Sequence, residues 1–147
     1  MKREILFRGK TKDKKWVEGF YTKGYRYYEA KSLEDFIYTY TYKKNSYDYS
    51  YAIVQPETIG QFTGLTDKNG KKIFEGDIVK AIQTEYDEDK EQEPFIFEVI
   101  GEMIFEDACF GLKAKKCIDF YSPMWEEDNV DLEVIGNIHD NPELLGE

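Results

Sequence analysis

The sequence predicts a mainly β protein of short antiparallel strands. Aromatic residues make up 16% of the chain, with 12 Tyr and 10 Phe against only 4 Pro, a composition that favours pleated, folded structure over disorder. Several runs alternate apolar and polar residues with period two. Short turns separate these runs, with little sign of helix. We therefore expect a small antiparallel sheet, either partly closed as an SH3-like barrel or strongly bent.

The strongest turn signal lies in the centre of the chain, between residues 59 and 79. Asn69-Gly70 is the pair that most readily accepts positive φ at both centres of a tight hairpin turn, and Asp67 suits the start of such a turn. Gly76-Asp77, preceded by a glutamate, predicts a second turn that leads into an apolar strand. The predicted structural turn residues are therefore Asp67, Asn69, Gly70, Gly76 and Asp77.

The remaining strands follow from alternation and from the turns that bound it. In chain order we expect strands at residues 3–9, 16–21, 36–42, 47–54, 95–105, 108–112, 117–121 and 132–138. The first two form a hairpin across a charged turn. Ser32, followed by two acidic residues, is also a suitable cap for a short helix. Gly136 predicts a bulge or bend in the last strand, and Asn141-Pro142 a single helical turn after it.

Two regions stand apart in composition. Residues 25–51 hold nine of the twelve tyrosines, and period-two alternation there places a row of them on one face of a sheet. Such a row is either a recognition surface or an ordinary half-buried sheet face. Residues 84–93 are densely charged and predict an exposed loop; they lack the spacing of a calcium-binding loop.

Charge and length limit the kinds of partner. At 147 residues the chain is most simply one domain, residues 1–147. Its formal charge of −10 repels phosphate backbones, so we expect no direct nucleic-acid partner. The acidic excess suits a basic partner, although it also serves solubility.

Cysteine usage and the absence of apolar runs indicate the compartment. Cys109 and Cys117 belong to no C-x-x-C motif, and we expect both as reduced thiols. The first ten residues contain no apolar stretch of signal-peptide length, and no run is long enough to span a membrane. We therefore expect a cytoplasmic protein with no membrane partner.

A search for catalytic chemistry finds little. His139 is the only histidine and belongs to no motif, and no nucleophile elbow, Walker A loop or H-E-x-x-H sequence is present. Asp67, Glu75 and Asp77 are the carboxylates that a metal-dependent nuclease would cluster, but each also suits a tight turn. We predict no catalytic, cofactor-binding or metal-binding residue.

Four stretches of the chain look like the YopX family. They are MKREILFRG at residues 1–9, PETIGQFTGLTDKNGKKIFEGDIVK at 56–80, CFGL at 109–112 and LEVIGNIHDNPELL at 132–145. The resemblance implies a phage or prophage protein of Gram-positive bacteria that is mostly β, lies in the cytosol of the bacterial host and self-associates. It implies no catalytic residue and no cofactor. Residues near 25–51 and 84–93 do not match it, and we interpret them as variable insertions.

These observations favour a non-enzymatic binding or assembly module of a phage. The expected partners are further copies of the chain, as a homo-oligomer, and a host or phage protein. One alternative is an acidic DNA mimic that inhibits a nucleic-acid-binding protein of the host. A metal-dependent enzyme acting through the turn carboxylates is the weaker alternative.

Overall fold

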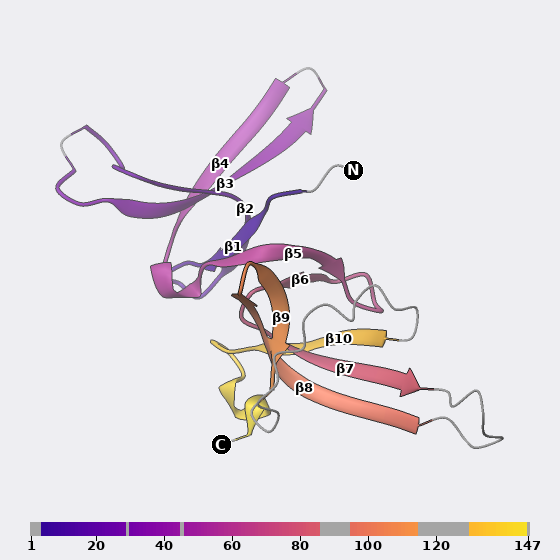
Figure 1. The fold of residues 1–147 in the computed structure, drawn as a ribbon. Coiled ribbons are helices and arrows are strands. Elements are labelled where there is room, and N and C mark those ends of the chain that lie inside the picture. The colour runs from indigo at the N-terminus through magenta and orange to yellow at the C-terminus, as the bar shows by residue number, and fades with distance from the viewer. Residues whose placement is uncertain (1–3, 29, 45, 86–94, 115–129, 147) are drawn as a thin grey trace. The chain divides into compact units, whose positions relative to one another are not determined.

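The protein is mainly β, which confirms the predicted fold class. The computed structural model describes residues 4–28, 30–44, 46–85, 95–114 and 130–146 (Figure 1). Its strands form two antiparallel sheets, and within these described residues they close into no barrel. The chain divides into two compact units, Met1–Gly64 and Leu65–Glu147, which are described separately below. No helix in the described part of the chain is long and apolar enough to cross a membrane.

The N-terminal unit is an antiparallel sheet whose strand order is β4-β3-β2-β1-β5. Its elements are β1 (Phe7–Lys10), β2 (Trp16–Gly24), β3 (Glu34–Lys43), β4 (Ser46–Val54), the 3-10 turn η1 (Pro56–Thr58) and β5 (Gly60–Thr66), which runs two residues past the boundary. The predicted N-terminal hairpin is present as β1 and β2, with Lys10 opposite Trp16. β3 and β4 form a longer hairpin in continuous register from Asp35↔Val54 to Lys43↔Ser46 (Figure 1).

The expected short helix after Ser32 is wrong, because β3 begins at Glu34. Pairing with β2 explains the difference, since Glu34 lies opposite Gly24 and Asp35 opposite Lys23. The Tyr21 hydroxyl donates a 2.7 Å hydrogen bond to Asp35 Oδ1, which gives this buried carboxylate a partner. Although Ser32 is a suitable helix cap, this segment forms a strand, because pairing across the sheet satisfies its backbone hydrogen-bonding groups.

Two glycines let the strands of this unit approach closely. A Cβ at Gly19 would lie 2.1 Å from the carbonyl oxygen of Tyr38, and one at Gly9 would lie 2.9 Å from Val54 Cβ. The side chains buried in this unit are mostly apolar. They include Leu6, Phe36, Ile37, Val54 and Phe62. Any larger residue at position 19 would push β3 away from β2, so the fold of this unit needs glycine there.

The C-terminal unit holds a four-stranded sheet in the order β10-β7-β8-β9. Its elements are β6 (Lys72–Phe74), β7 (Asp77–Glu85), β8 (Phe95–Glu106), β9 (Cys109–Lys113), β10 (Val130–Asn137) and the 3-10 turn η3 (Pro142–Leu145). The core cluster consists of Ile73, Val79, Met103, Leu112 and Leu132. The strand expected at residues 117–121, Cys117 and most of the acidic stretch 84–93 lie outside the described residues.

The predicted irregularity at Gly136 is confirmed. The register between β10 and β7 shifts between Val134 and Gly136, as a bulge requires. A Cβ at Gly136 would lie 2.8 Å from Leu144 Cδ1 and 2.8 Å from Asn141 Oδ1. The single helical turn expected after Asn141 is also confirmed, as η3. The missing side chain at position 136 therefore makes room for this turn against the end of β10.

Candidate functional site

The predicted turn residues Asp67, Asn69 and Gly70 lie together in one turn. The Gly70 N–H donates to the carbonyl of Asp67 at 2.9 Å, and the Asp67 N–H donates to the carbonyl of Lys71 at 2.8 Å. Gly70 has φ +79°, but Asn69 is not among the described residues with positive φ. The expectation of positive φ at both centres is therefore wrong. The hydrogen bonds fit a type I turn followed by a left-handed glycine, so that Gly70 adopts the positive φ and Asn69 does not.

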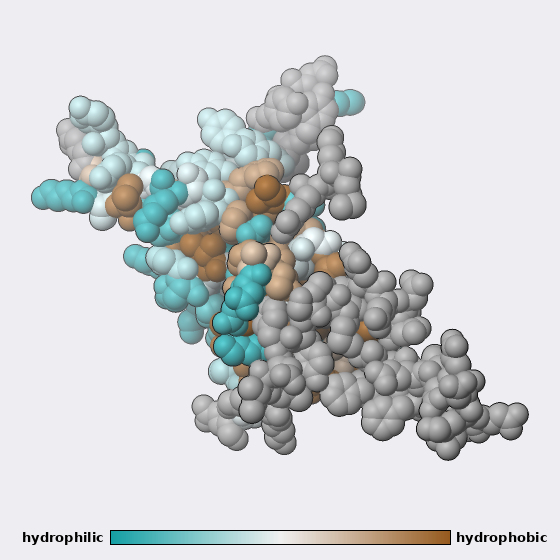
Figure 2. All heavy atoms as spheres, viewed as in Figure 1, coloured by the Kyte–Doolittle hydropathy of each residue, from teal (hydrophilic) through white to brown (hydrophobic). Residues whose placement is uncertain are grey.

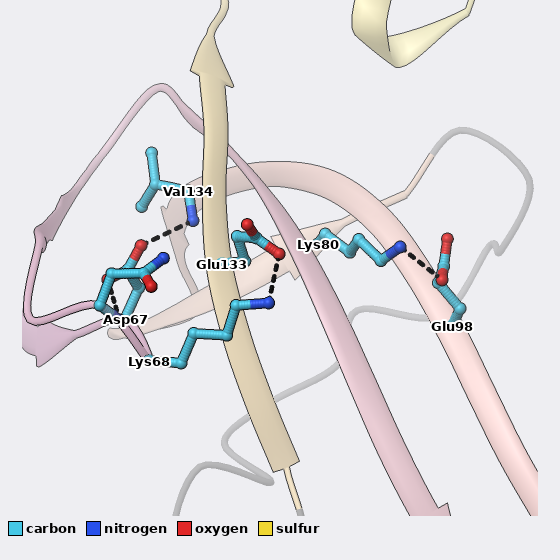
Figure 3. Close-up of polar contacts among 7 residues, drawn as sticks. Asp67, Lys68, Lys80, Glu98, Glu133 and Val134 are labelled. Carbon is cyan, nitrogen blue, oxygen red and sulfur yellow. Dashed lines mark hydrogen bonds and ion pairs between the residues drawn. The ribbon is translucent and has the colours of Figure 1, made fainter.

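The Asp67 carboxylate ties this turn to β10 (Figure 3). Oδ1 accepts hydrogen bonds from the backbone N–H groups of Asn69 at 2.8 Å and Lys71 at 2.9 Å, and Oδ2 accepts one from Val134 at 3.1 Å. The neighbouring Lys68 donates its N–H to the carbonyl of Leu132 at 2.9 Å. The turn is therefore held by its own backbone and by a strand distant in sequence.

Burial and hydrogen bonding act in opposite directions on the Asp67 carboxyl. Burial alone raises its pKa, because the charged form loses water. The backbone N–H groups of Val134, Lys71 and Asn69, together with the charge of Lys71, lower the pKa. Their combined effect exceeds that of burial, so the net pKa lies below the usual value of 3.8. The carboxylate therefore stays ionised in a nearly buried position.

Two salt bridges lie in the same unit as Asp67 (Figure 3). Lys68 Nζ contacts Glu133 Oε2 on β10 at 2.5 Å, and this contact is the main cause of the raised pKa of Lys68. Lys80 on β7 contacts Glu98 on β8 at 2.7 Å. Each pair joins neighbouring elements, although exposed pairs of this kind contribute little to stability.

Gly76 and Asp77 form the second turn. Asp77 is almost completely buried, and its Oδ2 accepts a 2.8 Å hydrogen bond from the Phe74 N–H. Gly76 has φ +77°; its N–H donates to the carbonyl of Met103, and its own carbonyl accepts from the Ile138 N–H, each at 2.9 Å. Both turn carboxylates thus bind backbone N–H groups.

The described residues contain no group of three or more His, Cys, Asp or Glu side chains that could hold a metal ion. The backbone N–H of His139 donates to Asn137 Oδ1 at 3.0 Å. Cys109 is half-buried, and its thiol donates to the carbonyl of Glu106 at 3.4 Å.

The tyrosine row lies on one face of β2, β3 and β4, which we call the aromatic face. Its members are Phe20, Phe36, Tyr38, Tyr40, Tyr49 and Tyr51. The strand register places them next to one another, with Tyr38 opposite both Phe20 and Tyr51, and Tyr40 opposite Tyr49. Alternation along paired strands thus gathers residues from three strands on one surface.

The rings of the aromatic face contact one another in two groups. Ring centroids lie 5.7 Å apart for Phe20 and Tyr40, 5.7 Å for Tyr38 and Tyr51, and 5.6 Å for Phe36 and Tyr51. Phe36 is buried, whereas Tyr40 and Tyr49 are 58% and 70% exposed. The described surface of this unit shows weakly hydrophilic and apolar residues side by side (Figure 2). Of the two interpretations of the tyrosine row, this exposure favours a recognition surface.

A cavity of about 380 Å³ adjoins the aromatic face at Tyr51. It is lined by Thr11, Lys12, Asp13, Arg26, Glu34, Tyr51, Ala52 and Ile53. Arg26 Nε lies 3.8 Å from Glu34 Oε2, so two of the charged groups form a loose ion pair. The cavity therefore combines an aromatic wall with charged groups of both signs.

Hydrogen bonds fix the wall of this cavity formed by the β1–β2 turn. The Thr11 N–H donates to the carbonyl of Lys15 at 2.9 Å, and the Lys15 N–H donates to Thr11 Oγ1 at 3.1 Å. The Gln55 N–H donates to the carbonyl of Lys10, and the Lys10 N–H to Thr58 Oγ1, at 2.9 and 2.8 Å. The turn is therefore tied to the chain after β4, which gives the wall a defined position.

The two units carry opposite formal charge. Residues 1–64 contain twelve Lys and Arg against eight Asp and Glu, a net charge of +4. Residues 65–147 contain eight Lys and Arg against twenty-two Asp and Glu, a net charge of −14. The aromatic face thus belongs to a basic unit, which the total of −10 conceals. The charges can be read from the sequence, but the net charge can be divided in this way only when the boundary between the two units is known.

We predict that Gly70→Val lowers the free energy of unfolding by about 1–2 kcal/mol, because a β-branched residue is strained at positive φ. No atom lies within 4 Å of a Cβ built at Gly70, so the cost is conformational. Gly24→Val is the matched control, since that glycine has equally open space and no positive φ. Urea unfolding of both variants checks this, and equal stabilities would contradict it.

We predict that Asp67→Asn destabilises the protein by about 2–3 kcal/mol at pH 7, because an amide presents one oxygen where three N–H groups need two. The folded pKa of Asp67 is lowered, so its contribution is full above the unfolded pKa and is lost as pH falls through the folded pKa. The difference between wild type and variant should therefore shrink as pH falls below about 4. A difference that stays constant from pH 7 to pH 3, in urea unfolding, would contradict this role.

Comparison with known proteins is consistent with this architecture. The family model described as YopX protein matches residues 6–146. No curated protein matches the chain. A solved structure, protein EF1440 from Enterococcus faecalis, is similar over 98% of this chain and 99% of its own, with 26% sequence identity and a TM-score of 0.50. The match of the family model over nearly the whole length confirms the resemblance noted in the sequence: the chain belongs to the YopX family.

Proposed function

We propose that the protein is a non-enzymatic binding or assembly module whose contact surface is the aromatic face. The observation that carries the proposal is a set of neighbouring rings on three paired strands, four of them more than half exposed. Tyrosine offers a large contact area and a hydroxyl at a low cost in conformational entropy, and it is enriched at protein interfaces. The neighbouring cavity supplies polar groups for orientation.

The roles of the turn carboxylates also support binding over catalysis. Asp67 and Asp77, two of the three acids considered for a metal-dependent enzyme, accept hydrogen bonds from backbone N–H groups of their own turns. These contacts use the carboxylate oxygens for structure. An enzyme acting through them would have to give up the hydrogen bonds that hold its own fold.

The proposed function is tested by capturing partners from a lysate of a Gram-positive bacterium. The bait is the full chain, either wild type or with Tyr40→Ser and Tyr49→Ser together. We expect proteins or nucleic acids that bind the wild type to be lost with the double variant. Phe105→Ser is the matched control, because Phe105 is also a ring more than half exposed (53%), but in the C-terminal unit. Equal recovery with all three baits would contradict the proposal.

We further propose that the protein is a homo-oligomer and that β4 supplies the contact. β4 ends the strand order of its sheet, and its nine residues contain one charge, Asp48, and no proline. Long edge strands without protective charges or bulges readily pair with another copy. Pairing along this edge extends the sheet and leaves the aromatic face open.

Light scattering at micromolar concentration tests the oligomer. We expect a mass above the 17.4 kDa of one chain, and more association at moderate salt, because salt screens the net charge of −10. Ser50→Lys on β4 should restore the single-chain mass. Thr39→Lys is the control, because it removes the same 2.7 Å hydroxyl pair from the interior strand β3. A single-chain mass for the wild type at both salt concentrations would rule out the oligomer.

A further inference from the structure

We infer that the aromatic face binds single-stranded nucleic acid. The inference rests on the proposed function, because it assigns a class of partner to the same surface. It also reverses the expectation drawn from the total charge, which excluded a nucleic-acid partner. Three features carry it: the rings, the cations at the ends of the face and the net charge of the N-terminal unit to which those cations belong.

The rings suit unpaired bases. Side chains on one face of a strand recur about every 6.6 Å, and rings on β3 and β4 lie opposite one another across the pair. Each base of a single strand exposes a π-face, whereas in a duplex those faces are stacked on one another. Tyr40, Tyr49 and Tyr51 are each more than half exposed and offer such stacking positions. An open sheet face of this kind therefore discriminates against duplex.

Cations lie at both ends of the aromatic face. Lys12 and Arg26 line the cavity beside Tyr51, and Lys44 lies exposed in the β3–β4 turn beyond Tyr40 and Tyr49. None of the six ring positions on the face has a basic residue opposite it in the strand register. Bases thus meet rings while the flanking phosphates meet Lys and Arg.

Acidic groups also line the cavity beside the aromatic face. Asp13 and Glu34 line it together with Lys12 and Arg26, and Glu34 Oε2 pairs loosely with Arg26. The guanidinium of Arg26 is about half exposed, so it can contact a phosphate while it stays beside Glu34.

The connection between β2 and β3 adds further exposed tyrosines with a basic residue among them. Tyr25, Tyr27 and Tyr28 are 61%, 63% and 103% exposed, and Arg26 lies between the first two. Alternating aromatic and basic side chains are the pattern of sequence-tolerant single-strand binding. This segment continues from the cavity that holds Arg26, so the aromatic face and the connection offer one extended path for a strand.

The charge of the N-terminal unit is complementary to such a ligand. Its +4 contrasts with the −14 of the C-terminal unit, and phosphate contacts made by Lys and Arg release counterions. Binding should therefore weaken as salt rises. The expected slope is modest, because few cations flank the face.

Fluorescence anisotropy with labelled (dT)15 and (rU)15 and the full-length protein tests the inference. We expect binding at 50 mM NaCl that weakens at 200 mM, and at least tenfold weaker binding to a 15-base-pair duplex. Tyr40→Ser with Tyr49→Ser should weaken single-strand binding by about tenfold or more. Lys12→Ala should lower the slope of log K against log salt by about 0.7, the value for one phosphate contact.

Matched variants separate this result from unfolding and from general anion binding. Tyr28→Ser removes a fully exposed ring outside the sheet, so it should weaken binding and leave the melting temperature unchanged. Phe105→Ser and Lys113→Ala, an exposed ring and an exposed cation of the C-terminal unit, should leave affinity unchanged. Equal displacement of (dT)15 by polyglutamate of matched charge would show an anion surface without base stacking and overturn the inference.

The result also distinguishes the inference from the proposed function. If neither oligonucleotide binds, but the tyrosine double variant still loses its captured partners, the partner of the aromatic face is a protein. The inference then fails and the proposed function stands. If the double variant changes neither oligonucleotide binding nor capture, both fail.

Discussion

The fold of the C-terminal unit depends on the carboxylate of Asp67. One side chain accepts hydrogen bonds from two N–H groups of its own turn and from Val134, which lies 67 residues away in sequence. Only a carboxylate has two oxygens with enough lone pairs for all three donors in this geometry. Charge-assisted bonds of this kind are about twice as strong as neutral ones, which offsets the cost of burying the charge. The turn thereby fixes where β10 lies against β7.

Local sequence predicts those turns that a single residue determines. Gly70 and Gly76 both adopt positive φ, at +79° and +77°, as turn glycines do. The turn between β8 and β9 shows the limit. There Asp107 and Ala108 both have positive φ, at 50° and 63°, although alanine rarely adopts it. Pairing of the flanking strands, with the rings of Phe105 and Phe110 4.9 Å apart, overrides the local preference.

The candidate site shows the same division between local and tertiary information. Period-two alternation predicted a row of tyrosines on one face, because strand geometry alone decides which side chains share a face. It left open whether that face is covered. The exposure of Tyr40 and Tyr49, and the cavity beside Tyr51, depend on where the β1–β2 turn and Arg26 lie. The position of the β1–β2 turn follows from hydrogen bonds between segments 40 to 50 residues apart, which no local pattern encodes.

The total charge conceals an uneven distribution of charge along the chain. A value of −10 describes the long-range field of the whole molecule, but within about 10 Å, the screening length at 0.1 M salt, a ligand senses mainly nearby groups. The basic unit contains the aromatic face, and the acidic unit supplies the excess of carboxylates. Steering from a distance and contact at the surface can therefore have opposite signs in this protein. Raising salt weakens the unfavourable field and the favourable phosphate contacts alike, so the salt slope of binding reports the difference between them. A slope smaller than the number of flanking cations implies is thus the expected signature of a basic binding surface carried by an acidic chain.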